Sequence, residues 1–276
     1  MSNDTLSTNK DKNKLLSSSK LLNLELYRNI INKNTLISIG IFLLIKLYVN
    51  YDSIILSLRG AFNPNILNFF QNAFGSFLNV LLFASLTVFF GFSFYNDYFS
   101  KYYQNYITKT GKKKYIFAKL ISMYISIFLV CLISFLLLYF ILLNFAWPKE
   151  PPYQEFKIDI SFYELRNISP FLFIFLLSIS YSLYYTIWCA AGFLLSLFIS
   201  NKKALFILPS LVYTSFFALY SFVPAMRLID PLYYTRFLLD TGGIFSSFLM
   251  GVFIDCLFLY IIYIFSRDRI KKVIKC

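Results

Sequence analysis

Long apolar runs alternate with short polar or charged connections along the whole chain. A transmembrane helix needs about 20 predominantly apolar residues. Six runs come close to this length or exceed it, at residues 35–51, 73–95, 117–143, 170–199, 204–222 and 244–265. The pattern therefore predicts an all-α polytopic membrane protein with six transmembrane helices. The intervening residues 144–169 and 223–243 are predicted to form external loops.

Composition agrees with this fold class. The chain has 276 residues, of which 58% are hydrophobic and 14% charged, whereas soluble domains carry about 25% charged residues. The first apolar run begins only near residue 35 and has no small-residue cleavage site, so we expect no N-terminal signal peptide.

The distribution of charge predicts the orientation. The termini and alternate loops on one side hold 19 basic and five acidic residues, a net +14, whereas the other side holds six basic and seven acidic residues, a net −1. Positive charge collects on the cytoplasmic side of membrane proteins. Both termini are therefore predicted to be cytoplasmic, and the overall charge of +13 needs no nucleic acid to explain it.

Two kinds of segment precede the first apolar run. Residues 1–14 are rich in Ser, Asn, Thr and Lys and are predicted to be a disordered basic tail. In residues 15–33, Leu22, Leu26 and Ile30 recur at helical spacing beside Lys20 and Arg28. This segment is predicted to be an amphipathic helix that lies flat on the anionic cytoplasmic leaflet. Residues 267–276 form a second basic cytoplasmic tail.

The cytoplasmic loop at 96–116 is polar and rich in tyrosine. We expect a short helix from about Asp97 that stops near Gly111. On such a helix Tyr98, Tyr102 and Tyr106, spaced four apart, would form one aromatic ridge suited to a groove on a partner. A solvated basic loop that touches lipid headgroups is the alternative, and composition does not decide between them.

The layout resembles a known family. Six spans, cytoplasmic termini, an amphipathic helix before the first span and this inner loop are similar to the membrane subunit of a type-2 ABC transporter, the ABC-2 permease family. Family members often carry an acidic residue, a short helix, a Ser or Pro turn with basic residues, and an Ala-Lys pair at the start of span three. The matching positions in this chain are Asp97, Thr110, Lys112 to Lys114, Ala118 and Lys119. A second match is the Pro-aromatic segment from Ile229 to Tyr234.

The resemblance implies a function and a set of partners. Two permease subunits, either identical or paralogous, would pair in the bilayer, each on its own ABC ATPase subunit that binds ATP and Mg²⁺. The inner loop would receive the ATP-driven motion through residues Asp97, Tyr98, Tyr102, Tyr106, Thr110, Gly111 and Lys112. In the family, spans two and five line the substrate route, so the candidate substrate path comprises Asn72, Ser76, Asn79, Ser210, Thr214 and Ser221.

Absent motifs exclude several enzyme classes. The chain has no histidine, and its four cysteines are scattered, so imidazole bases and the common zinc motifs are excluded. The pair Gly111 and Lys112 lacks the other residues of a phosphate-binding P-loop. We therefore expect no metal site, no cofactor and no ATPase activity in this chain alone.

Two charges fall within the apolar runs. Lys46 and Asp255 lie about 16 and 15 Å from the inner ends of spans one and six at ~1.5 Å per residue. A charge at this depth costs roughly 2.5–3.5 kcal/mol on insertion scales, so we predict an ion pair within or between subunits. Alternatively, Lys46 extends its amine toward the interface, or Asp255 is protonated beside hydroxyl groups.

The leading hypothesis is a permease subunit of an exporter in a bacterial cell membrane that moves an amphipathic or hydrophobic substrate, such as a peptide, an antimicrobial or a lipid-like molecule. The bacterial origin is suggested by a Lys, Asn, Ile, Phe and Tyr bias typical of AT-rich genomes. The alternative is a membrane anchor, immunity protein or sensor subunit for a cytoplasmic ATPase that transports nothing.

Overall fold

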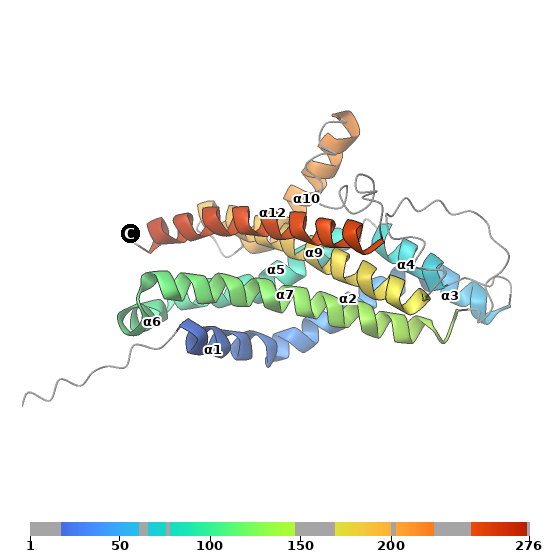
Figure 1. The fold of residues 1–276 in the computed structure, drawn as a ribbon, viewed down its shortest axis with the longest axis horizontal. Helices are drawn as coiled ribbons and strands as arrows, with labels where there is room; N and C mark the ends of the chain where they lie inside the picture. The colour runs from blue at the N-terminus through green and yellow to red at the C-terminus, as the bar shows by residue number, and fades with distance from the viewer. Residues whose placement is uncertain are drawn as a thin grey trace, which may run out of the picture.

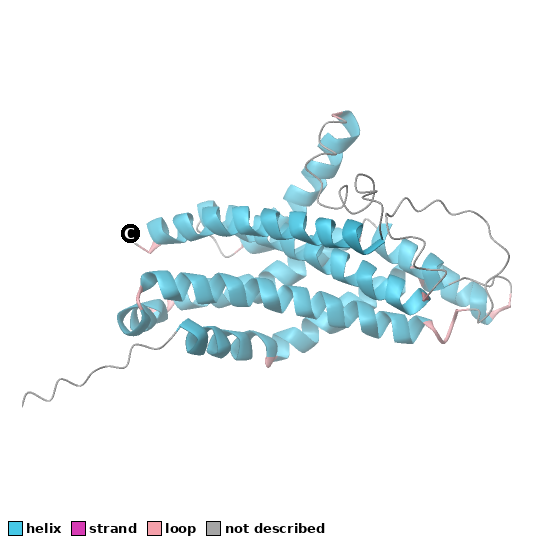
Figure 2. Ribbon diagram, viewed as in Figure 1, coloured by secondary structure: helices cyan, strands magenta, loops and turns pink. Residues whose placement is uncertain are grey.

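A computed structural model describes residues 18–60, 66–75, 78–146, 169–199, 203–223 and 244–274. In these ranges every regular element is an α-helix and no strand occurs (Figure 2). The predicted all-helical class is confirmed for the described residues. The predicted N-terminal tail at 1–14 and most of both predicted external loops lie outside them.

Ten helices are described. They are α1 (Ser18–Ile30), α2 (Lys33–Val49), α3 (Tyr51–Leu58), α4 (Ile66–Gly75), α5 (Asn79–Phe99), α6 (Tyr102–Thr110), α7 (Lys112–Leu142), α9 (Pro170–Ile199), α10 (Ala204–Phe222) and α12 (Ile244–Val273).

The long helices run side by side in an elongated bundle (Figure 1). Helix α9 is central, because it packs against α5, α7, α10 and α12. Helices α1 and α6 and the C-terminus lie toward one end of the bundle, and α3 and α4 lie toward the other (Figure 1). The last part of α10 stands away from the other helices (Figure 1).

Among the described residues, four helices are long and apolar enough to cross a membrane, at Asn79–Phe99, Lys112–Leu142, Phe171–Ile199 and Phe248–Val273. Helices α1 and α2, bent by 52° at their junction, make a fifth if they are counted as one broken span. Helix α10 has a shorter apolar stretch, Ala204–Phe216. Helices α2 and α10 cover the predicted spans at 35–51 and 204–222, but a count of six crossings remains a prediction.

The helix bounds differ from the predicted ones at several places. The predicted span from residue 73 begins in α4, which ends at Gly75, and α5 starts only at Asn79. Helix α3 was not predicted, because its eight residues follow an apolar run with no Gly or Pro between them. Helix α7 begins at Lys112, before the predicted residue 117, because lysine favours helix while hydropathy marks only the apolar part.

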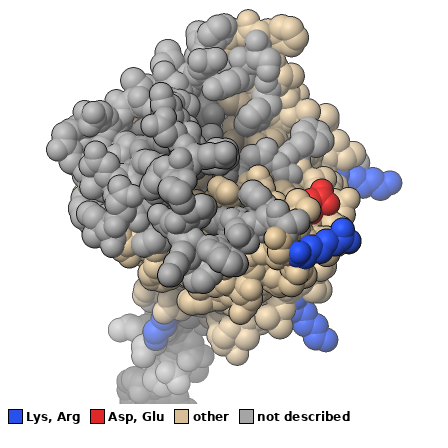
Figure 3. All heavy atoms as spheres, turned by 90° about the vertical axis from the view of Figure 1, so that its right-hand side faces the viewer, with Lys and Arg blue, Asp and Glu red and all other residues tan. Residues whose placement is uncertain are grey.

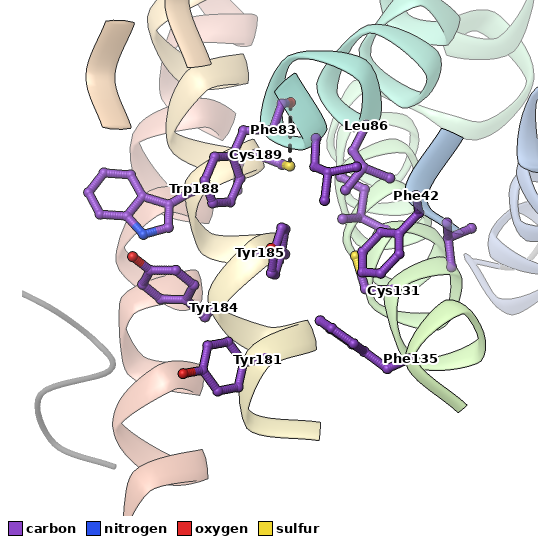
Figure 4. Packing of buried hydrophobic residues seen from close by; sticks show 14 of the residues in the cluster. Phe42, Phe83, Leu86, Cys131, Phe135, Tyr181, Tyr184, Tyr185, Trp188 and Cys189 are labelled. Atoms are coloured by element: carbon purple, nitrogen blue, oxygen red, sulfur yellow. Dashed lines mark hydrogen bonds between the residues drawn. The ribbon is translucent and has the colours of Figure 1, made fainter. Parts of the chain in front are cut away.

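Aromatic side chains fill the centre of the bundle. The ring of Tyr185 on α9 lies 4.8 Å from Phe83, 5.9 Å from Phe42 and 6.0 Å from Phe135, measured between centroids (Figure 4). Helices in lipid gain little from apolar burial as such, since lipid tails are equally apolar, and associate largely through close packing. Interlocking rings from α2, α5, α7 and α9 supply that packing.

A glycine permits close contact between α9 and α10. A Cβ atom at Gly192 of α9 would lie 2.5 Å from Cγ and 2.7 Å from Cα of Pro209 on α10. Gly192 therefore lets the backbones of α9 and α10 approach, as small residues do in membrane helices.

Large apolar side chains also cover the outside of the bundle. Leu44 and Tyr48 on α2 and Phe253 and Phe265 on α12 are exposed. Figure 3, which looks onto the α3 end, shows few Lys, Arg, Asp or Glu side chains among the described residues. An apolar outer surface of this kind suits a lipid environment.

Candidate functional site

Two residues with positive φ frame the short helix α6. Lys101, before α6, has a φ of 56°, and Gly111, after it, has a φ of 83°. This left-handed conformation costs little for glycine but is uncommon for lysine. The chain thus turns sharply at both ends of α6, which lies between the end of α5 and the start of α7.

A buried group of four charged side chains lies next to this hairpin. Lys119 on α7 donates to Glu25 on α1 over 2.9 Å and to Asp97 on α5 over 2.7 Å. Arg28 on α1 donates to the other oxygen of Asp97 over 2.8 Å and lies 3.7 Å from Glu25. We call Glu25, Arg28, Asp97 and Lys119 the ion cluster. It joins three helices that are distant in sequence.

The ion cluster is electrically balanced and almost dry. Its two carboxylates and Lys119 have 2–4% of their side-chain surface exposed, whereas Arg28 has 39%. The hydroxyl of Tyr115 also donates to Asp97, over 3.3 Å. Buried charges are tolerated when each has opposite charges and hydrogen bonds that offset the loss of water. Each charge here has both.

Helix α1 turns its charged face inward. Leu21, Glu25 and Asn29 are buried against the bundle, and the amide of Asn29 donates to Ser122 on α7 over 3.2 Å. The apolar side chains of Leu24, Tyr27 and Ile31 are exposed instead. The predicted apolar face of this helix comprised Leu22, Leu26 and Ile30. These side chains are partly buried and lie beside the inward face.

The predicted aromatic ridge is divided into two pairs. Tyr98 belongs to α5 and stacks on Tyr103 at 5.7 Å, while Tyr102 and Tyr106 on α6 meet edge to face at 5.2 Å. The prediction of one ridge is wrong, because the turn at Lys101 separates Tyr98 from the other two. Burial raises the pKa of Tyr106 to about 12, and the hydrogen bond to Tyr102 acts in the same direction.

The predicted helix start at Asp97 is also wrong. Asp97 lies in the last turn of α5, and α6 begins at Tyr102. The predicted stop near Gly111 agrees with the end of α6 at Thr110.

The remaining predicted coupling residues anchor the end of α6. The buried hydroxyl of Thr110 donates to the carbonyl of Tyr106 over 2.7 Å. The amine of Lys112 donates to the carbonyl of Lys271 on α12 over 2.7 Å. The outward face of α6 presents Tyr102, Gln104, Asn105, Thr108 and Lys109. This face is available to a partner.

Three neutral groups accept hydrogen bonds from Lys46, which was predicted to pair with Asp255 within or between subunits. Its fully buried amine donates to the backbone carbonyl of Ala73, to Oδ1 of Asn79 over 2.5 Å and to the hydroxyl of Tyr185 over 2.9 Å. Asp255 is buried on α12, which packs against α7 and α9. The pairing of Lys46 with Asp255 between subunits remains a prediction.

The candidate substrate-path residues do not share one surface. Asn79 faces Lys46, whereas Asn72 is exposed with its amide 3.4 Å from the hydroxyl of Ser53. Ser210 donates to the carbonyl of Val80 over 3.1 Å, and the exposed Thr214 donates to the carbonyl of Ser210 over 2.8 Å. Ser76 and the side chain of Ser221 lie outside the described residues, so a path along spans two and five remains a prediction.

Sequence reasoning missed most of the ion cluster. In the sequence, Asp97 and Lys119 match positions of the resembled family, Arg28 gives charge to the predicted amphipathic helix, and Glu25 counts among the acidic residues of the cytoplasmic side. One signal was present, since Glu25 is the sole acidic residue between Asp11 and Asp52. A lone carboxylate among many basic residues is a candidate for a buried ion pair with one of them.

No group of three His, Cys, Asp or Glu side chains among the described residues could hold a metal ion. Comparison with family models, with curated proteins and with solved structures gives no match to this chain.

Proposed function

We propose that the chain is the permease subunit of a type-2 ABC exporter in a bacterial cell membrane, with six crossings and both termini in the cytoplasm. Two permease subunits pair, and each binds one ATPase subunit that carries ATP and Mg²⁺. The complex moves an amphipathic or hydrophobic substrate outward.

The observation that supports this proposal is the link between α6 and the ion cluster. Helix α6 is held between α5 and α7, and Asp97 on α5 and Lys119 on α7 pair across the base of this hairpin. Through Glu25 and Arg28 the same cluster includes α1. A displacement of α6 by an ATPase is therefore passed to three helices together, because a packed and ion-paired unit moves as a body.

The outer face of α6 suits a protein partner. Tyr102 is 49% exposed, and tyrosine is common among residues that dominate binding energy at interfaces. Lys109 at the end of the same helix is also exposed and adds a positive charge. Net positive charge at this end of the bundle agrees with a cytoplasmic location.

The test begins with the neighbouring genes, where we expect an ABC ATPase, and continues with reconstitution of both proteins in proteoliposomes. We expect ATP hydrolysis that depends on the chain, and Tyr102→Ala should lower the coupled rate at least five-fold. Tyr48→Ala, which removes an exposed tyrosine from α2, is the matched control and should leave the rate unchanged. Binding of the ATPase with hydrolysis that never responds to the chain would instead support an anchor or sensor subunit.

A further inference from the structure

Helices α4 and α5 are separate, and the side chain of Lys46 reaches both. Helix α4 ends at Gly75, and α5 begins at Asn79. The amine of Lys46 donates to the carbonyl of Ala73 in the last turn of α4 and to Oδ1 of Asn79, the first residue of α5. One ammonium group from α2 thus bridges the end of one helix and the start of the next.

The carbonyl oxygen of Ala73 accepts a hydrogen bond from a donor outside its own helix. In an α-helix this oxygen accepts from the N–H group four residues later, and the described α4 has only two residues after Ala73. The last four carbonyls of any helix are left in this state, and they carry the negative end of the helix dipole. A buried cation at that position satisfies the oxygen and matches its charge.

The surroundings of the ammonium group complete this arrangement. The hydroxyl of Tyr185 on α9 also accepts from this amine, over 2.9 Å, and an ammonium has three N–H donors to direct at such groups. The rings of Phe42, Phe135 and Tyr185 have their centroids 5.4–5.7 Å from the nitrogen, within cation–π range. The site is built for a cation without requiring a carboxylate.

We propose that Lys46 is an internal cap for the C-terminus of α4 and that it fixes α4 against α5 and α9. This role makes the position of α4 depend on α2, and it holds whether or not the chain transports a substrate. Without the cap, the end of α4 loses its contact with the ammonium, and α4 opens locally while the long helices stay folded.

Hydrogen–deuterium exchange of the full chain in detergent micelles tests the proposal. Lys46→Met keeps the length of the side chain but removes the ammonium. We expect amide exchange in peptides covering residues 66–82 to be at least ten-fold faster than in the original chain, with no change in residues 114–127 of α7. Lys33→Met, which replaces an exposed lysine on the same helix, is the matched control and should change neither region.

A second variant keeps the test decisive if Lys46→Met does not fold. Asn79→Asp places a carboxylate beside the ammonium and should slow exchange at residues 66–82 at least three-fold, provided that Lys46 is present. The proposal is overturned if Lys46→Met exchanges like the original chain, if it speeds exchange equally in all helices, or if Asn79→Asp leaves exchange at residues 66–82 unchanged or faster.

Discussion

The ammonium of Lys119 lies 2.7 Å from the carboxylate of Asp97, although 22 residues separate them along the chain. Helix α6 lies within that interval, so this contact closes the base of the α5–α6–α7 hairpin. Both side chains are almost fully buried. The hairpin is thus held by an ion pair in a region with little access to water. If one of the two side chains were removed, water could not take its place.

Removing one charge from the ion cluster should be costly. Lys119→Met leaves the carboxylate of Glu25 buried. Its remaining neighbouring cation in the ion cluster is then Arg28, at the longer distance of 3.7 Å. We expect a loss of about 3–5 kcal/mol in the free energy of unfolding, the range for breaking buried ion pairs. The thermal unfolding midpoint in detergent measures it. Lys113→Met, at an exposed lysine of the same helix, should shift the midpoint little, and equal midpoints for both variants would show that the cluster is not stabilising.

Removing a matched pair of charges should be milder. The double variant Glu25→Gln with Lys119→Met leaves Arg28 and Asp97 paired over 2.8 Å. Residues in direct contact show interaction energies of about 0.5–3 kcal/mol, so the double variant should be more stable than Lys119→Met alone. Additive losses in a double-mutant cycle would contradict a direct Glu25–Lys119 interaction.

Gly192 should tolerate no side chain. Its Cβ would lie 2.7 Å from the backbone Cα of Pro209, and backbone atoms cannot turn away. We expect Gly192→Ala to lower the free energy of unfolding by about 1–3 kcal/mol through overpacking. Gly40→Ala is the matched control, because a Cβ there meets nothing within 4 Å. It should be neutral or stabilising by up to ~1 kcal/mol, and the reverse order of the two variants would refute the close contact.

Cysteines introduced at opposite ends of the bundle should react with a maleimide from opposite sides of the membrane. In a chain carrying Cys256→Ser and Cys276→Ser, we expect Arg59→Cys to react with a membrane-impermeant maleimide in intact cells. Lys109→Cys should react only in inside-out vesicles, because basic residues are retained in the cytoplasm. Both native side chains are exposed. Reaction of both cysteines in intact cells would overturn the proposed orientation.

Hydropathy predicted the long helices well, because backbone groups in lipid must be satisfied within a helix and side chains there must be apolar. It did not predict the turn at Lys101, since a lysine with positive φ has no sequence signature. The stop at Gly111 was predictable, because glycine adopts that conformation readily. The ion cluster was not, because it forms only when α1, α5 and α7 meet in space.

The acceptors of Lys46 were also not predictable from the sequence. Its depth in an apolar run indicated that a partner was needed, and Asp255 was the obvious charged candidate. The observed acceptors are a carbonyl, an amide and a hydroxyl. Neutral groups of this kind are too common in a sequence to stand out, so only the fold identifies them.

The inward charged face of α1 has a consequence for biosynthesis. Glu25 leaves the ribosome 94 residues before Lys119, an interval of roughly 5–20 s at usual rates of synthesis. During that time its carboxylate has no cation from α7 and stays hydrated. We therefore expect α1 to dock onto the bundle only after α7 has been made.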